Sequence, residues 1–153
     1  MLTVQVTETI GCAPEELLTF VMDIERYAEI DRKIRPVHWV RRAGDYTEFG
    51  CRGHLAGIPT PKVVQWMRVT PGQRVDIGLA GPPRNRLTRM LAEFTASFEV
   101  TATGDGRTRA VRTLNFTFRP PLRRIAEPLL RERLTAEVRE EMTLAKQRLE
   151  GCS

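Results

Sequence analysis

Arg68 is the first residue whose type and position could do chemistry. It lies in the strand-like stretch Lys62 to Val69, where it shares a face with Val64 and Trp66 because side chains two apart point the same way. A guanidinium keeps its charge at any accessible pH, and on a buried apolar face it must meet acceptors such as a ligand oxygen. The alternative is that this face is exposed and the other set of side chains turns inward: Val63, Gln65, Met67 and Val69.

Arg112 shows the same pattern in a later strand-like stretch, Thr108 to Arg119. It shares a face with Leu114 and Phe116, so the same two orientations are open to it. Because it lies near one end of the stretch, its long side chain could also reach solvent. If both faces turn inward, we expect Arg112 to line the same buried site as Arg68.

Other catalytic arrangements find little support in the sequence. The only serines are Ser97, on the polar face of a strand-like stretch, and Ser153, which argues against a Ser-His-Asp hydrolase. Cys51 and His54 hint at a metal, but residues three apart on a strand point to opposite faces, and His38 is the only other histidine. No glycine-rich phosphate loop occurs. We therefore expect no metal site and no cofactor.

The composition is that of one ordinary domain, residues 1–153, with 41% hydrophobic and 28% charged residues. No apolar run approaches 18 residues, so no membrane span is expected. The N-terminal stretch alternates like a strand, which argues against a secretory signal. Three widely separated cysteines, Cys12, Cys51 and Cys152, suggest no disulfide framework, so we expect free thiols and a cytoplasmic location.

The longest helical pattern follows Pro120-Pro121 and runs to Glu150. Pro128 should kink this helix or mark where its main part begins. One face of the helix carries an apolar stripe with helical spacing: Leu130, Leu134, Val138, Met142, Ala145 and Leu149. Such a stripe needs a large apolar surface to cover it, and the rest of the chain must supply that surface.

The preceding chain predicts about seven strands and two short helices. The helices begin near Pro14 and Asp23. The strands are bounded by Gly and Pro turns, which predicts an antiparallel arrangement. Their expected ranges are Leu2 to Ile10, Val37 to Arg42, Thr47 to Leu55, Lys62 to Val69, Arg74 to Ala80, Leu91 to Thr103 and Thr108 to Arg119.

The order of these elements, together with several local stretches, resembles the START-like superfamily (SRPBCC, or helix-grip fold), in particular its polyketide cyclase/dehydrase branch. The resemblance rests on Ala13 to Glu29 (A-P-E-E-L-L-x-F-V-x-D-I-E-R-Y-A-E), on Trp66 to Val69, on Thr113 to Pro120 and on the final helix. It covers Leu2 to Glu150. It implies an α+β fold in which a curved antiparallel sheet wraps around the long C-terminal helix and encloses an elongated, mainly apolar cavity.

The resemblance also implies which residues face that cavity. Tyr27 falls at an aromatic position after the first helix, and Arg68 falls at the cavity arginine of a middle strand, where we assign it a catalytic role. Ile34 stands where a tyrosine is expected, which removes a proton donor. The expected ligand-binding residues are Tyr27, Val64, Trp66, Arg68, Phe94, Phe98, Arg112, Leu114, Phe116, Leu134 and Val138.

Two functions remain open at this stage. The first is a cyclase- or aromatase-like factor that folds a ketone-bearing chain while Arg68 stabilises enolate or alkoxide charge. The second is a non-catalytic carrier or sequestering protein for a lipid, quinone or toxic aromatic metabolite. The first predicts a convergent polar group in the cavity, whereas the second tolerates a fully apolar one.

The basic residues suggest one further partner. Arg84, Arg86 and Arg89 follow Pro82-Pro83 and form either a solvated loop or, by the resemblance, a patch beside the cavity mouth that attracts an acyl carrier protein. The terminal helix is nearly neutral, with seven Lys/Arg and six Glu between 122 and 150. We therefore expect no nucleic-acid binding.

Overall fold

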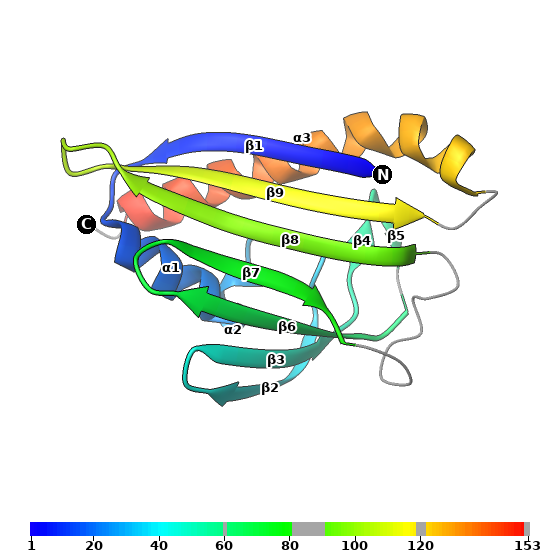
Figure 1. Cartoon of the computed structure of the whole chain (residues 1–153), viewed down its shortest axis with the longest axis horizontal. Coiled ribbons are helices and arrows are strands. Elements are labelled where there is room, and N and C mark those ends of the chain that lie inside the picture. The colour runs from blue at the N-terminus through cyan, green and yellow to red at the C-terminus, as the bar shows by residue number, and fades with distance from the viewer. Residues whose placement is uncertain (60, 81–90, 119–121, 152–153) are drawn as a thin grey trace.

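Seven strands form one antiparallel sheet in the computed structural model, which describes residues 1–59, 61–80, 91–118 and 122–151. The order across the sheet is β1-β9-β8-β7-β6-β3-β2, so the N-terminal strand pairs with the last one (Figure 1). This confirms the predicted α+β, helix-grip architecture. The strands are β1 (Leu2–Ile10), β2 (Val37–Ala43), β3 (Tyr46–Cys51), β6 (Val63–Thr70), β7 (Arg74–Leu79), β8 (Leu91–Ala102) and β9 (Thr108–Phe118).

One predicted strand is split in two. The stretch Thr47 to Leu55 leaves the sheet after β3, and its end forms β4 (His54–Leu55), which pairs with β5 (Ile58–Pro59) in a separate hairpin. The break occurs at Gly53, where an added Cβ would lie 1.8 Å from the Lys33 carbonyl oxygen. Only glycine permits this close backbone approach.

The described residues also form three helices, which are α1 (Pro14–Met22), α2 (Ile24–Tyr27) and α3 (Leu122–Gly151). α3 runs along β1 and β9, while α1 and α2 lie towards the other half of the sheet (Figure 1). The predicted stripe on α3 is confirmed, because its middle residues, from Leu134 to Ala145, are fully buried, while Leu130 and Leu149 at its ends are partly buried against the core. Pro128 lies inside α3, so the expectation that the main helix begins there is wrong.

The two faces of the sheet differ in composition. The concave face is apolar and includes Phe49, Met67 and Phe98, each buried. The convex face carries both tryptophans, and each indole covers a glycine on the neighbouring strand, Trp39 over Gly50 and Trp66 over Gly78. The concave face therefore holds the core and any internal site. The described part of the chain has no helix long and apolar enough to cross a membrane.

Candidate ligand cavity and its charged cluster

A cavity of about 80 Å³ lies on the concave face of β3, β6, β7, β8 and β9, under α1, α2 and the loop that follows α2. This space is enough for several waters. Most of its wall is apolar and comes from side chains such as Phe49, Met67, Ile77, Phe94, Leu114 and Phe116. The polar groups are few and come from Tyr27, Asp31, Lys33, Gln65 and Arg112. An apolar cavity with a few convergent polar groups is the usual form of a small-molecule site.

Five of the predicted ligand-binding residues line this cavity. Tyr27 reaches it from α2, Phe94 from β8, and Arg112, Leu114 and Phe116 from β9. Arg112 points inward with only 5% of its surface exposed, so it does not extend to solvent. Ile34, at the position where the resemblance led us to expect tyrosine, also lines the cavity and adds an apolar wall.

The predicted inward orientation of Arg68 is wrong. Arg68 is exposed on the convex face of β6, and its guanidinium carbon lies 5.4 Å from the centre of the Tyr46 ring. Val64 and Trp66 share that outer face, so neither contributes to the cavity wall. The opposite set turns inward instead, with Val63, Gln65 and Met67 buried against the cavity. The catalytic role assigned to Arg68 has no structural basis.

Three further predicted residues belong to the core and do not line the cavity. Leu134 and Val138 are fully buried on α3, which packs on β1 and β9 beside the cavity and contributes none of its described wall. Phe98 lies on the concave face, where its ring packs against Tyr27 with 6.3 Å between ring centres. The cavity is thus covered by α1, α2 and the following loop rather than by the long helix.

The arginines proposed to attract an acyl carrier protein, Arg84, Arg86 and Arg89, lie outside the described residues. Cys12 and Cys51 are free thiols, as predicted, and Cys152 lies outside the described residues. Cys51 is buried, which with nearby Asp31 raises its thiol pKa to about 12. Among the described residues no group of three or more His, Cys, Asp and Glu side chains could hold a metal ion.

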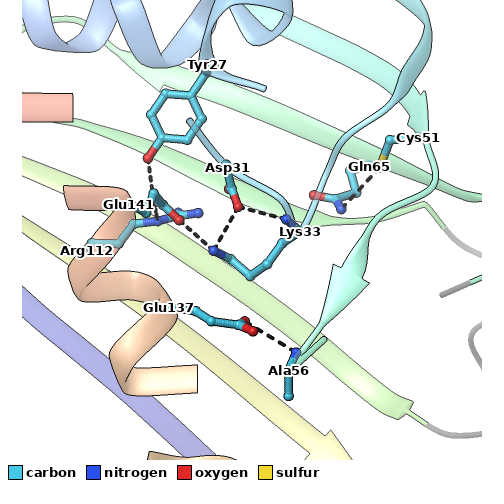
Figure 2. A network of polar contacts seen from close by, with 9 residues as sticks. All are labelled: Tyr27, Asp31, Lys33, Cys51, Ala56, Gln65, Arg112, Glu137 and Glu141. Atoms are coloured by element: carbon cyan, nitrogen blue, oxygen red, sulfur yellow. Dashed lines mark hydrogen bonds and ion pairs between the residues drawn. The ribbon is translucent and has the colours of Figure 1, made fainter. Parts of the chain in front are cut away.

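Glu141 is the centre of a buried charged cluster at the polar end of the cavity (Figure 2). Its Oε2 accepts hydrogen bonds from the Tyr27 hydroxyl and from Arg112 Nε, the latter at 3.0 Å. Its Oε1 accepts a hydrogen bond from Lys33 Nζ at 2.7 Å. One carboxylate on α3 therefore joins α2, the loop after α2 and β9.

Asp31 completes this cluster from the same loop as Lys33. Its Oδ1 lies 2.8 Å from Lys33 Nζ and accepts a hydrogen bond from the Lys33 backbone N–H at 3.0 Å. The loop is held in place by the close approach of Gly53 to the Lys33 carbonyl and by a hydrogen bond from the His54 N–H to the Arg32 carbonyl at 3.0 Å. Gly53, where the predicted strand splits, thus packs against the loop whose Lys33 reaches Glu141 on α3.

The electrostatics of the cluster keep Glu141, Lys33 and Arg112 charged, whereas burial opposes the charge of Asp31. Burial alone would raise the pKa of Glu141, but Arg112 and Lys33 lower it to about 2. Burial and then the charge of Glu141 raise the pKa of Asp31, while Lys33 opposes that shift. Burial lowers the pKa values of Lys33 and Arg112, but the nearby carboxylates outweigh it and raise both overall. Tyr27 stays neutral because burial and Glu141 raise the pKa of its hydroxyl far above the usual value.

Arg112 keeps one donor that the cluster does not use. Its guanidinium carbon lies 5.5 Å from the centre of the Phe98 ring, and its Nε bonds to Glu141. Its buried Nη1 finds no acceptor among the residues that the structure describes. Leaving a charged donor unpaired in a low-dielectric site is costly, so this nitrogen is a candidate point of contact for a ligand oxygen.

Sequence reasoning missed Asp31, Lys33 and Glu141, and it placed Gln65 inward only in the alternative orientation of its strand. A signal for Glu141 was present, because it stands three residues after Val138 and four before Ala145, on the same side of α3 as the apolar stripe. A carboxylate at such a position is expected to face the core and to need a cation there. Arg112, an arginine on an apolar strand face, is that cation.

The comparisons with known proteins agree with this architecture. The family described as polyketide cyclase/dehydrase and lipid transport matches residues 1–150. The chain belongs to this family. Because one fold can serve several functions, the function of this family member has to be inferred from its cavity rather than from its fold. No curated protein matches the chain.

Solved structures with the same fold include three that cover almost the whole chain. A protein of Thermus thermophilus has 16% identity over 99% of both chains and a TM-score of 0.80. The Zhui aromatase/cyclase of a Streptomyces strain, R1128, has 14% identity over 95% of this chain and 94% of its own, with a TM-score of 0.74. A START superfamily protein of Mycobacterium smegmatis has 15% identity over 99% of both chains and a TM-score of 0.72. At these identities the likeness concerns the fold.

Proposed function

We propose that this protein binds a small aromatic or polyketide-like molecule in the cavity and acts on it as a cyclase-like factor. The observation that carries the proposal is Arg112, which lines the cavity and whose buried Nη1 has no protein acceptor among the described residues. A carbonyl or phenol oxygen would satisfy it, and the apolar wall would hold the rest of the ligand. Because the free space is about 80 Å³, a ligand with an aromatic ring system must widen the cavity as it binds. The acyl carrier protein remains a prediction without structural support.

The same geometry suits cyclisation of a ketone-bearing chain. In such a step Asp31 would take a proton from a carbon between two carbonyl groups, and Arg112 would stabilise the resulting enolate oxygen. The enolate carbon then attacks a second carbonyl of the folded chain, and the proton held by Asp31 returns to the new alkoxide. The raised pKa of Asp31 supports this role, since a stronger base is the more effective proton acceptor.

Binding is tested with a ligand pair in which a carbonyl group replaces one CH2 group, 2-acetylnaphthalene and 2-ethylnaphthalene. The protein variant is Arg112→Met/Glu141→Gln, which removes the donor, leaves the Lys33–Asp31 pair balanced and keeps an acceptor for the Tyr27 hydroxyl. Titration followed by NMR should show that the parent prefers the ketone and that the variant loses about 1.5–3 kcal/mol of affinity for the ketone alone.

Arg68→Met is the matched control, because it makes the same arginine substitution on the convex face. It should bind both ligands like the parent. Equal ketone affinity in the parent and the double variant would show that Arg112 does not bind the ketone oxygen, and would favour an apolar carrier.

Catalysis is tested separately with an aryl-capped linear tetraketone. The parent should accelerate formation of the cyclised aldol product, which becomes aromatic by losing water, above the rate in buffer, and Asp31→Asn should abolish that acceleration. Mass spectrometry of the products would report both. Tight binding of the tetraketone without acceleration would point to the second candidate, a carrier or sequestering protein, which the predominantly apolar wall also supports.

A further inference from the structure

The cluster at the end of the cavity balances its charges. It contains two cations, Lys33 and Arg112, and two anions, Asp31 and Glu141. Asp31 and Glu141 are each 2% exposed, and the side chains of Arg112 and Lys33 are 6% and 11% exposed. Solvent therefore screens these charges little, and their sum decides the potential that a ligand meets.

No other charged side chain offsets this balance within the described cavity wall. The remaining polar lining residues are Tyr27, which donates its hydroxyl proton to Glu141, and Gln65, an uncharged amide. The pKa of Glu141, lowered to about 2 by Arg112 and Lys33, keeps its carboxylate charged at neutral pH. The Asp31 carboxylate lies 2.8 Å from Lys33 Nζ and accepts a hydrogen bond from the Lys33 backbone N–H at 3.0 Å, and both contacts stabilise its charged form. With Asp31 ionised, the polar end of the cavity combines an unpaired nitrogen, Arg112 Nη1, with a net charge of zero.

We propose that this charge balance makes the cavity selective for ligands whose oxygen-bearing end is uncharged, and that Glu141 is the specificity-determining residue that excludes carboxylates. The inference rests on the proposed function of the cavity and names its ligand class: neutral ketones and phenols, and not fatty acids or other carboxylates. A carboxylate would bring a third negative charge into an apolar site that holds only two cations, both already paired.

The assignment of selectivity to Glu141 follows from what Arg112 would do alone. A buried guanidinium without a carboxylate partner attracts anions, and arginine binds carboxylates through parallel hydrogen bonds. Glu141 occupies Arg112 Nε and cancels its charge, so the unpaired Nη1 that a ligand could reach belongs to an ion pair with no net charge. A neutral substrate also fits the proposed chemistry, because proton transfer from substrate to Asp31 moves charge within the cavity without changing its sum.

The test compares two probes of nearly equal shape, neutral 2-acetylnaphthalene and anionic 2-naphthoate, by NMR titration at pH 7. The parent should bind the ketone at least roughly tenfold more tightly than the carboxylate. Glu141→Gln keeps the size of the side chain and leaves a net charge of +1, so it should shift the ratio of the two affinities by roughly 10- to 100-fold towards the carboxylate. Glu140→Gln, which removes the same charge from an exposed neighbour on α3, should leave the ratio unchanged.

Two further variants change the net charge of the cluster at other residues, so the inference can still be tested if Glu141→Gln fails to fold. Asp31→Asn also leaves a net charge of +1 and should move the ratio in the same direction. Lys33→Met leaves a net charge of −1 and should move it in the opposite direction. A ratio that stays within threefold of the parent in all three variants would overturn the inference while leaving ketone binding, and with it the proposed function, in place. Failure of every variant and the parent to bind either probe would overturn both.

Discussion

Each face of the sheet carries an arginine that has apolar neighbours on its own strand face, but one of these arginines is buried and the other is exposed. Arg112 and Arg68 each share a strand face with two large apolar residues. On β9 that face is concave, and Arg112 is buried with its Nε on Glu141. On β6 it is convex, and Arg68 is exposed above the Tyr46 ring.

The difference lies in what the neighbouring elements place opposite each strand. Trp66, beside Arg68, covers Gly78 on β7, so its large apolar side chain finds contact on the outer face without a second layer. Arg112 faces α3, which supplies a carboxylate in the middle of an apolar stripe. An arginine among apolar residues thus indicates a buried site only where another element brings its counterion.

The largest loss of stability is expected from a substitution in the apolar stripe of α3, where the helix packs on the concave face. Val138→Asp places a charge at a fully buried position and should destabilise the protein by about 5 kcal/mol or more, since the cations of the cluster nearby, Arg112 and Lys33, already pair with Glu141. Arg139→Asp, at the adjacent exposed position, should have a small effect. Urea unfolding measures both, and similar midpoints for the two variants would mean that α3 does not dock through this stripe.

The contrast between the two arginines is tested by making the same substitution at each. Arg112→Met leaves Asp31 and Glu141 with Lys33 as their single cation, and breaking a buried pair in this way should cost about 3–5 kcal/mol. Arg68→Met removes an exposed side chain and should change stability by less than about 0.5 kcal/mol. Denaturant unfolding at pH 7 gives the free energy of unfolding of both variants. Equal losses would contradict the assignment of Arg112 to a buried face and Arg68 to an exposed one.

Acid should weaken the concave cluster through Glu141. The pKa of Glu141 is lowered in the folded protein, from 4.5 to about 2, so its contribution is complete above pH 4.5 and is lost as the pH falls towards 2. Asp31 acts in the opposite direction, because its raised pKa makes its ionised form the destabilising one. The advantage of the parent over Glu141→Gln should therefore shrink, by on the order of 3 kcal/mol, across this range.

Glu140→Gln provides the baseline for this pH series, since it removes a carboxylate that is 56% exposed. Unfolding free energies of the three proteins at several pH values give the comparison. A parent advantage over Glu141→Gln that is the same at pH 2.5 and pH 6 would show that Glu141 does not carry the charge assigned to it.

The smallest effect is expected on the convex face. Gly78→Ala would place a Cβ 2.6 Å from Cζ2 of the Trp66 indole, so the ring must move outward. We expect a loss of about 1 kcal/mol, a change in tryptophan fluorescence and unchanged binding of 2-acetylnaphthalene. Gly151→Ala, which has no atom within 4 Å of the added Cβ, is the control. A large loss of ligand binding in Gly78→Ala would mean that the convex face is coupled to the cavity.

The strand and helix pattern could be predicted because it is local. Alternation along β8 and β9 and the four-residue spacing on α3 follow from the geometry of single elements. The split at Gly53 could not be predicted in this way, because its cause is the approach of the Lys33 backbone from another segment.

The site was predicted less well because its decisive contacts are not local. Alternation correctly grouped Arg68 with Trp66 and Arg112 with Phe116, but it cannot say which group turns inward. The partners of Glu141 lie far along the chain, Arg112 29 residues before it and Lys33 108 residues before it. Such partners become visible only when the register of the sheet and the docking of the last helix are known.

The position of Glu141 also bears on how fast the protein folds and unfolds. Its contact with Tyr27 spans 114 residues of chain, and that with Lys33 spans 108, so neither can form before the ends of the chain have been brought together. Loop-closure entropy must be overcome before such contacts contribute, which places them late on the folding pathway. Interactions that form after the transition state leave the folding rate almost unchanged and slow unfolding instead. The buried cluster would then act chiefly by slowing unfolding, so it sets the lifetime of the folded state after the last helix has packed on the sheet.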